Sequence, residues 1–333
     1  MIMILRSFAS NQPYVLVSLP IAVGAVLLPS IWMQPLRSLD LNLPLSAELS
    51  GLFTEPWVTS IAAVAIVLLG SWLSNAVFNR SEFYNTPTYV VALLFALFGS
   101  VFAMYQLNFS VLLAGLLVLL GLERQLCIFK QSRVLSLCFE TGFWYGLATL
   151  LFPPFATLIA GAWIALLFNR AFNLREHLLL LISFSLPFLY WFVYLFWFDR
   201  THDFVLFRII ASFDPPKLSF QWTWTLFYLV LIAGCGLIIG LPRYLKPADR
   251  AGNRTKMVKN TFLIMAVAQV CSMLIGYTLY HVWILPASLV VAVVMLGYWF
   301  TNYRYSLLAP LVFYALMILG ALTVSGHYLT MPS

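Results

Sequence analysis

Charged residues are few in this chain, and they gather in short clusters between long apolar runs. Only 9% of the residues are charged, 62% are hydrophobic, and the mean hydropathy is +0.94. A helix that crosses a bilayer needs about 20 consecutive apolar residues. Runs of this kind are Val15 to Met33, Trp57 to Phe78, Leu178 to Phe198, Trp222 to Leu241 and Thr261 to Tyr280. The pattern predicts an all-α fold, a polytopic transmembrane helix bundle, with residues 1–333 as one integral membrane domain.

The number of crossings depends on two stretches that are too long for one helix and short for two. Residues 88–122 can divide near Gln106, and residues 135–168 contain Pro153-Pro154, which removes two backbone donors. If both are hairpins, the chain has eleven crossings, and ten is the nearest alternative. The predicted helices then cover 14–33, 57–78, 88–107, 109–122, 135–152, 154–168, 178–198, 222–241, 261–280, 284–300 and 306–326.

The distribution of basic residues favours eleven crossings with a cytoplasmic N-terminus. In that arrangement 14 of the 18 Lys and Arg residues lie in inner loops, as the positive-inside rule requires. The inner set is Arg6, Arg80, Arg124, Lys130, Arg133, Arg170, Arg175, Arg243, Lys246, Arg250, Arg254, Lys256, Lys259 and Arg304. A net charge of +7 is thereby explained by membrane topology, so no nucleic-acid partner is expected. We predict a multi-pass protein of the bacterial inner (cytoplasmic) membrane, with membrane lipid as its first partner.

Three loops are long enough to carry further structure. Residues 45–53 and 204–213 predict two outer interfacial helices. The inner loop Pro242 to Asn260 holds six basic residues and one acid, Asp249, and is predicted to anchor the topology against anionic head groups.

Glu140 is the one acid that falls inside a predicted helix. An ionisable group within the hydrocarbon region is a functional candidate. The alternative is that Glu140 lies at head-group level, because Arg133 is only two helical turns away.

Metal and disulfide chemistry are not expected. The four histidines form no H-x-x-H or H-x-x-x-H pair, and the cysteines form no C-x-x-C pair. The predicted topology leaves only a three-histidine outer site open, formed by His202, His281 and His327 without His177. We therefore predict no metal site and no cofactor, with Cys127, Cys138, Cys235 and Cys271 as packing residues.

Charged side chains crowd the predicted outer face near two helix ends. Asp40 follows the first helix, and Arg200, His202 and Arg208 follow the seventh. A carboxylate that acts as base, with arginines that hold phosphate, suits catalysis on a lipid-linked phosphate. The alternative is that Asp199 to Asp203 simply cap the second interfacial helix.

Five short motifs lie at or beside the predicted helices. They are Ser10-Asn11-Gln12-Pro13, Phe78-Asn79-Arg80-Ser81-Glu82-Phe83, Phe139-Glu140-Thr141-Gly142-Phe143-Trp144-Tyr145-Gly146-Leu147-Ala148, Phe172-Asn173-Leu174-Arg175-Glu176-His177 and Asn302-Tyr303-Arg304. Their order resembles an uncharacterised bacterial family of polytopic inner-membrane proteins, a domain of unknown function whose members are sometimes labelled carotene oxygenases. The resemblance spans nearly the whole chain, although each motif is short.

In architecture the chain is similar to C-type membrane glycosyltransferases and polysaccharide polymerases. Those families share an acid in the first outer loop, outer interfacial helices and a Gly-rich hairpin with a proline break, which Asp40 and Gly142 to Pro154 match in kind. This resemblance implies a role in envelope glycoconjugate assembly, on a polyprenyl-phosphate-linked sugar at the outer face. Two alternatives stay open: a non-enzymatic subunit or scaffold with a membrane protein partner, and a transporter.

Overall fold

The computed structural model describes residues 14–27, 45, 56–80, 88–105, 109–128, 134–201, 234, 253–280, 293–298, 300, 312, 314, 315 and 318. Within these residues the chain is helical and has no strand. The elements are α2 (Tyr14–Leu27), α5 (Pro56–Arg80), α6 (Val90–Tyr105), α7 (Phe109–Cys127), α8 (Leu135–Leu151), the 3-10 helix η2 (Pro153–Ala156), α9 (Thr157–Asn169), α10 (Leu174–Trp197) and α14 (Asn253–Tyr280).

In the described part of the chain, four helices are long and apolar enough to cross a membrane. They cover Trp57–Arg80, Phe109–Cys127, Leu174–Trp197 and Thr255–Gly276. Two shorter apolar segments, Val90–Val101 and Pro153–Asn169, lie between them in the chain. The all-helical fold and its membrane-length helices agree with the sequence analysis. The predicted helices 222–241 and 306–326, and both interfacial helices, lie almost wholly outside the described residues.

Three helices extend beyond their predicted ends. α7 continues from 122 to Cys127, α10 begins at Leu174 instead of 178, and α14 begins at Asn253 instead of 261. Residues 253–260 of the predicted inner loop are therefore helix. The apolar pattern stops at the first charge, whereas a helix continues where its charged side chains find partners or solvent.

The proline pair separates two helices, as predicted. α8 ends at Leu151, Phe152 is extended, and Pro153 opens η2. Beyond the break, Arg170 at the end of α9 donates from Nη1 to the carbonyl oxygen of Ile128, 3.2 Å away. The residues before α8 and after α9 thus lie at the same end of the bundle, which is the geometry of a hairpin.

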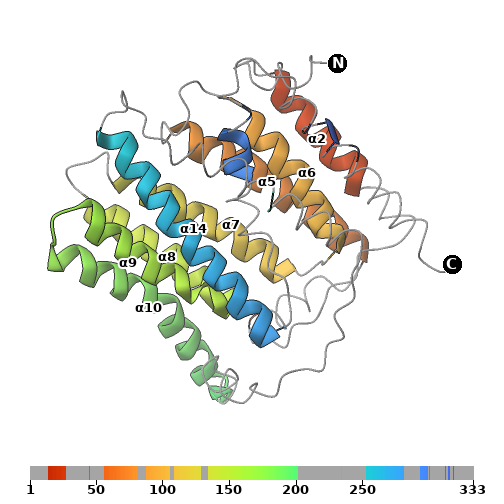
Figure 1. Ribbon diagram of the computed structural model, residues 1–333. Helices are drawn as coiled ribbons and strands as arrows, with labels where there is room; N and C mark the ends of the chain where they lie inside the picture. The colour runs from red at the N-terminus through yellow and green to blue at the C-terminus, as the bar shows by residue number, and fades with distance from the viewer. Residues whose placement is uncertain are drawn as a thin grey trace.

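Figure 1 shows the order of the helices across the molecule, from α2 in red at one edge to α10 in green at the other. α5 packs against both α6 and α7, α7 packs against α8, and α8 packs against α10. α14 returns along α9 and η2. α6 and α7 are consecutive in the chain, yet their main common neighbour is α5.

Two glycines let α8 and α10 approach closely. A Cβ on Gly142 would collide with Ser183 Oγ and the Leu180 carbonyl oxygen, and one on Gly146 would collide with the Phe184 carbonyl oxygen. The spacing is Gly-x-x-x-Gly, which brings helix backbones together in membranes, where dispersion contacts replace the hydrophobic drive between helices. The glycine pair therefore positions α8 directly on α10.

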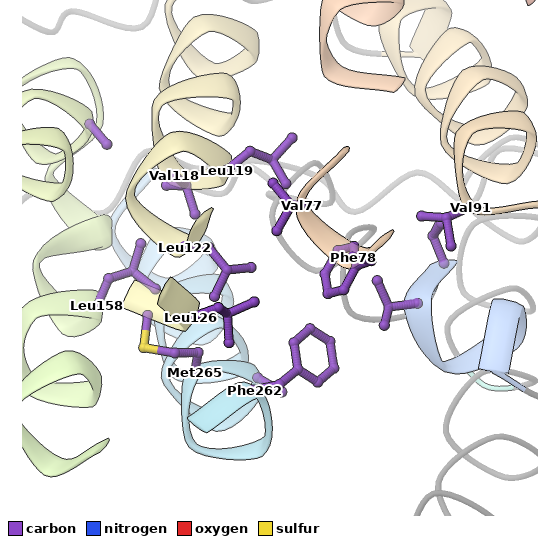
Figure 2. Packing of buried hydrophobic residues seen from close by; sticks show 14 of the residues in the cluster. Val77, Phe78, Val91, Val118, Leu119, Leu122, Leu126, Leu158, Phe262 and Met265 are labelled. Atoms are coloured by element: carbon purple, nitrogen blue, oxygen red, sulfur yellow. The ribbon is translucent and has the colours of Figure 1, made fainter. Parts of the chain in front are cut away.

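The apolar core includes residues of α2, α5, α6, α7, α8, α9 and α14, and one part of it joins α5, α7, α9 and α14. Figure 2 shows Phe78 of α5 facing Phe262 of α14, with Leu122 and Leu126 of α7 beside them. The two rings meet edge to face, with centroids 5.5 Å apart. Large side chains at this junction are fully buried, so distant parts of the sequence share one core.

Candidate functional site

Ion pairs gather at one end of the bundle and join five helices. Arg80 Nη1 at the end of α5 lies 2.7 Å from Glu123 Oε1 of α7, and Arg124 Nε lies 2.9 Å from Glu140 Oε2 of α8. Arg170 Nε after α9 lies 3.6 Å from Glu176 Oε2 in α10. We call this set of six residues the ion-paired end.

α14 also begins at the ion-paired end. Asn169 Nδ2 at the end of α9 donates to Thr261 Oγ1 at 3.1 Å. Lys259 Nζ donates to the Tyr298 hydroxyl at 3.0 Å and lies 4.7 Å from the centroid of its ring. At the start of α6, the Thr88 N–H donates to Asn79 Oδ1 at 3.2 Å. The basic groups that the sequence assigns to inner loops thus lie together wherever they are described.

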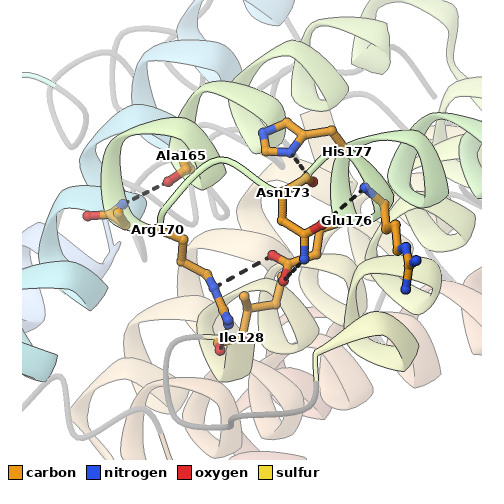
Figure 3. Close-up of polar contacts among 8 residues, drawn as sticks. Ile128, Ala165, Arg170, Asn173, Glu176 and His177 are labelled. Atoms are coloured by element: carbon orange, nitrogen blue, oxygen red, sulfur yellow. Dashed lines mark hydrogen bonds and ion pairs between the residues drawn. The ribbon is translucent and has the colours of Figure 1, made fainter.

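Figure 3 shows the polar contacts that join α9 to α10. The Asn173 side chain caps α10, because its Oδ1 accepts from the Arg175 N–H at 3.2 Å while its Nδ2 donates to Glu176 Oε1 at 3.2 Å. Glu176 is buried, so its carboxylate is held both by this amide and by Arg170. These bonds fix the geometry of the turn.

His177 is buried in the same corner among aromatic rings. Its Nδ1 lies 2.9 Å from the Asn173 carbonyl oxygen, which can only accept, so Nδ1 carries the proton. Nε2 has no hydrogen-bond partner among the described residues, and the centroids of the Phe172 and Trp163 rings lie 4.9 Å and 6.3 Å from that of the imidazole. From its place in the sequence, His177 is predicted only to lie at the inner membrane face, apart from the three outer histidines.

Glu140 has a cation beside it. It lies in the second turn of α8, and its carboxylate and the Arg124 guanidinium are 38% and 44% exposed. α7 and α10 contain two further acids, Glu123 and Glu176. Both fall in predicted loops, because the predicted bounds end α7 at residue 122 and begin α10 at residue 178. Arginines flanked by glutamates at the ends of apolar runs are the signal that could have identified these pairs.

Arg200 lies at the other end of α10. The chain turns at Asp199, which has φ 53°, and the Arg200 N–H donates to the Leu195 carbonyl oxygen at 2.8 Å. Arg200 is exposed, and the part of α10 from Glu176 to Trp197, roughly 32 Å of helix, separates it from Glu176. Asp40, His202 and Arg208 lie outside the described residues, so their convergence with Arg200 stays a prediction.

One buried hydrogen bond joins α7 to α8. The Tyr145 hydroxyl donates to Gln125 Oε1 at 2.7 Å, and the Tyr145 ring packs against Gly121. Both side chains are fully buried. A polar contact of this kind holds transmembrane helices in one register.

The described residues contain no group of three or more His, Cys, Asp and Glu that could hold a metal ion. Within the described part of the chain, Cys127, Cys138 and Cys271 form no disulfide bond. Cys235, His202, His281 and His327 are not among the described residues.

No family model, curated protein or solved structure matches the chain.

Proposed function

We propose that the chain is a multi-pass protein of the bacterial inner membrane that acts on a polyprenyl-phosphate-linked sugar at the outer face, in the manner of a C-type glycosyltransferase or a polysaccharide polymerase. The proposal has two parts, a membrane orientation and an outer site. Each part has its own support and its own experiment.

Support for the orientation comes from the ion-paired end. Arg80, Arg124 and Arg170 belong to three different predicted inner loops, and contacts between neighbouring helices bring them to one end. Cytoplasmic loops collect Lys and Arg. We therefore take the ion-paired end as cytoplasmic, with eleven crossings and the N-terminus on the same side.

The observation that carries the outer site is the position of Arg200. It leaves α10 at the end opposite to the paired arginines, and it is exposed. An exposed arginine at the end of a membrane-length helix can bind a phosphate through two parallel N–H bonds. The proposal adds Arg208 and His202 as further phosphate contacts and Asp40 as the catalytic base.

The outer site is tested with the purified protein in nanodiscs, supplied with a polyprenyl-phosphate-linked sugar as donor and a second sugar as acceptor. Turnover is measured as transfer of the donor sugar to the acceptor hydroxyl with release of the polyprenyl phosphate. Asp40→Asn is expected to abolish turnover without reducing the amount of folded protein, because an acid in a surface cavity, the position proposed for Asp40, contributes little to stability. Arg200→Gln is expected to weaken donor binding. Glu48→Gln, in the same predicted loop as Asp40, is the matched control and should keep full activity.

A wild-type protein that neither binds nor turns over the donor contradicts the enzymatic proposal, and the scaffold function then leads. One observation favours it: Glu123, Glu140 and Glu176, the described acids inside membrane-length or packed helices, are all engaged by arginines. Such pairs serve assembly. A transporter would need polar groups other than these paired ones along its path. Two assays separate these alternatives: copurification of a membrane protein partner supports the scaffold, and uptake of a solute supports the transporter.

A further inference from the structure

The turn between α9 and α10 exposes apolar side chains beside a cation. Phe168 is 79% exposed, Phe172 is 66% exposed and Leu174 is 58% exposed. Arg175 follows directly and is also exposed. Large apolar side chains gathered on an exposed turn mark a contact surface.

The cap at Asn173 determines which way Arg175 points. Glu176 is turned inward, where it meets Arg170 and Asn173. Because successive residues are about 100° apart around a helix, the neighbouring Arg175 is turned away from that buried contact. The turn therefore presents a guanidinium outward, next to Phe172 and Leu174.

The charge left over at this end is positive. Among the described residues, each of its three glutamates is paired with an arginine. Arg175 and Lys256 are exposed there and form no ion pair within the described chain. Of these two cations, Arg175 is the one flanked by exposed apolar side chains, Phe172 and Leu174.

We propose that the α9–α10 turn binds an anionic phospholipid. Arg175 holds the lipid phosphate through its guanidinium, and Phe168, Phe172 and Leu174 lie among the upper acyl carbons. A lipid matches both parts of this surface, since its charge and its hydrocarbon lie side by side. Anionic lipids are abundant in the cytoplasmic leaflet, the leaflet proposed for this end.

The test uses the full chain in detergent, titrated with phosphatidylglycerol or phosphatidylcholine of equal chain length and followed by native mass spectrometry. Wild type should prefer phosphatidylglycerol. Arg175→Gln should lower its affinity about fivefold, the factor that corresponds to about 1 kcal/mol for one basic group at an anionic surface. Phosphatidylcholine binding should not change.

Lys256→Gln is the matched control, because it removes an exposed cation from the same end without touching the turn, and it should keep the preference. Arg175→Lys, which keeps the charge, should retain most of it. An unchanged preference in Arg175→Gln overturns the proposal. Equal losses in Arg175→Gln and Lys256→Gln also overturn it, since they indicate diffuse attraction. Glycerophosphoglycerol is the head group of phosphatidylglycerol without acyl chains. If it competes at the same concentration as the lipid, the site binds a soluble phosphate, and the lipid proposal is overturned.

Discussion

Glu176 and Glu140 both meet an arginine, but they differ in their access to solvent. The Glu176 carboxylate is 9% exposed and that of Glu140 is 38% exposed. A buried acceptor that loses its partner keeps the full cost of desolvation, whereas an exposed one is rehydrated. The two pairs should therefore contribute unequally to stability.

Arg170→Gln is expected to lower the free energy of unfolding by about 1–3 kcal/mol, the cost of a buried polar group left without its partner. Arg124→Gln is expected to cost less than about 1 kcal/mol, because its pair is partly exposed. Thermal unfolding of both variants in one detergent, followed by tryptophan fluorescence, compares them. Equal losses would mean that burial does not decide the strength of these pairs.

Tyr145→Phe is expected to destabilise the protein by about 1–3 kcal/mol, since Gln125 Oε1 would stay buried without its donor. Tyr190→Phe is the control, because Tyr190 is 63% exposed. Chemical denaturation in mixed micelles measures both. A Tyr145→Phe variant as stable as Tyr190→Phe would show that Gln125 finds another donor.

The partners of single residues could not be predicted from the sequence. The basic residue nearest to Glu140 along the chain is Arg133, whereas the ion pair of Glu140 is with Arg124 of α7. Arg80 and Glu123 are separated by the whole of α6. Pairs across helices depend on which helices are neighbours, and hydropathy says nothing about that.

At the scale of helices, Gly142 and Gly146 determine how closely α8 approaches α10. Gly142→Val should destabilise the protein by about 1–3 kcal/mol, because the added carbons have no free space at Ser183 and Leu180. Ala160→Val, on the exposed side of α9, adds comparable volume without a clash and should be neutral. Unfolding of both in the same detergent is the measurement, and equal stability would argue that α10 can move away at no cost.

Apolar runs predicted helices well and their ends less well. α5 and α8 fall within two residues of the predicted bounds, and the division at Pro153 follows from the missing N–H groups. α14 begins eight residues early because Lys256 and Lys259 extend to solvent or to Tyr298 while the backbone stays helical. A charge ends an apolar run, but it does not end a helix.

For the whole molecule, orientation is the prediction to test first. With native cysteines replaced, Ala171→Cys and Gly252→Cys should resist an impermeant thiol reagent in intact cells and react after lysis. Phe198→Cys, at the other end of α10, should react in both. Ala171 and Phe198 are both exposed, so access to the reagent is comparable. Labelling of Ala171→Cys in intact cells, with Phe198→Cys protected, would invert the orientation.

The packing of the helices against one another could not be predicted from the sequence. Alternation of charge indicated which ends lie together, and the described contacts at Asn169 and Arg170 agree with it. That α5 packs against both α6 and α7, and that α14 returns along α9, depends on side-chain fit such as Gly161 against Ala268. The outer site stays a prediction because three of its four residues are not described.

The three ion pairs of the described residues share one order along the chain, with the arginine before its glutamate. Arg80 comes before Glu123, Arg124 before Glu140, and Arg170 before Glu176. The interval is longest for Arg80, which is synthesised 43 residues before Glu123. At about 5–20 residues per second, this interval lasts roughly 2–9 s. Until Glu123 is made it cannot neutralise the charge of Arg80, and a basic residue beside a new helix biases the orientation of that helix. Once the pair has formed, the same guanidinium joins α5 to α7.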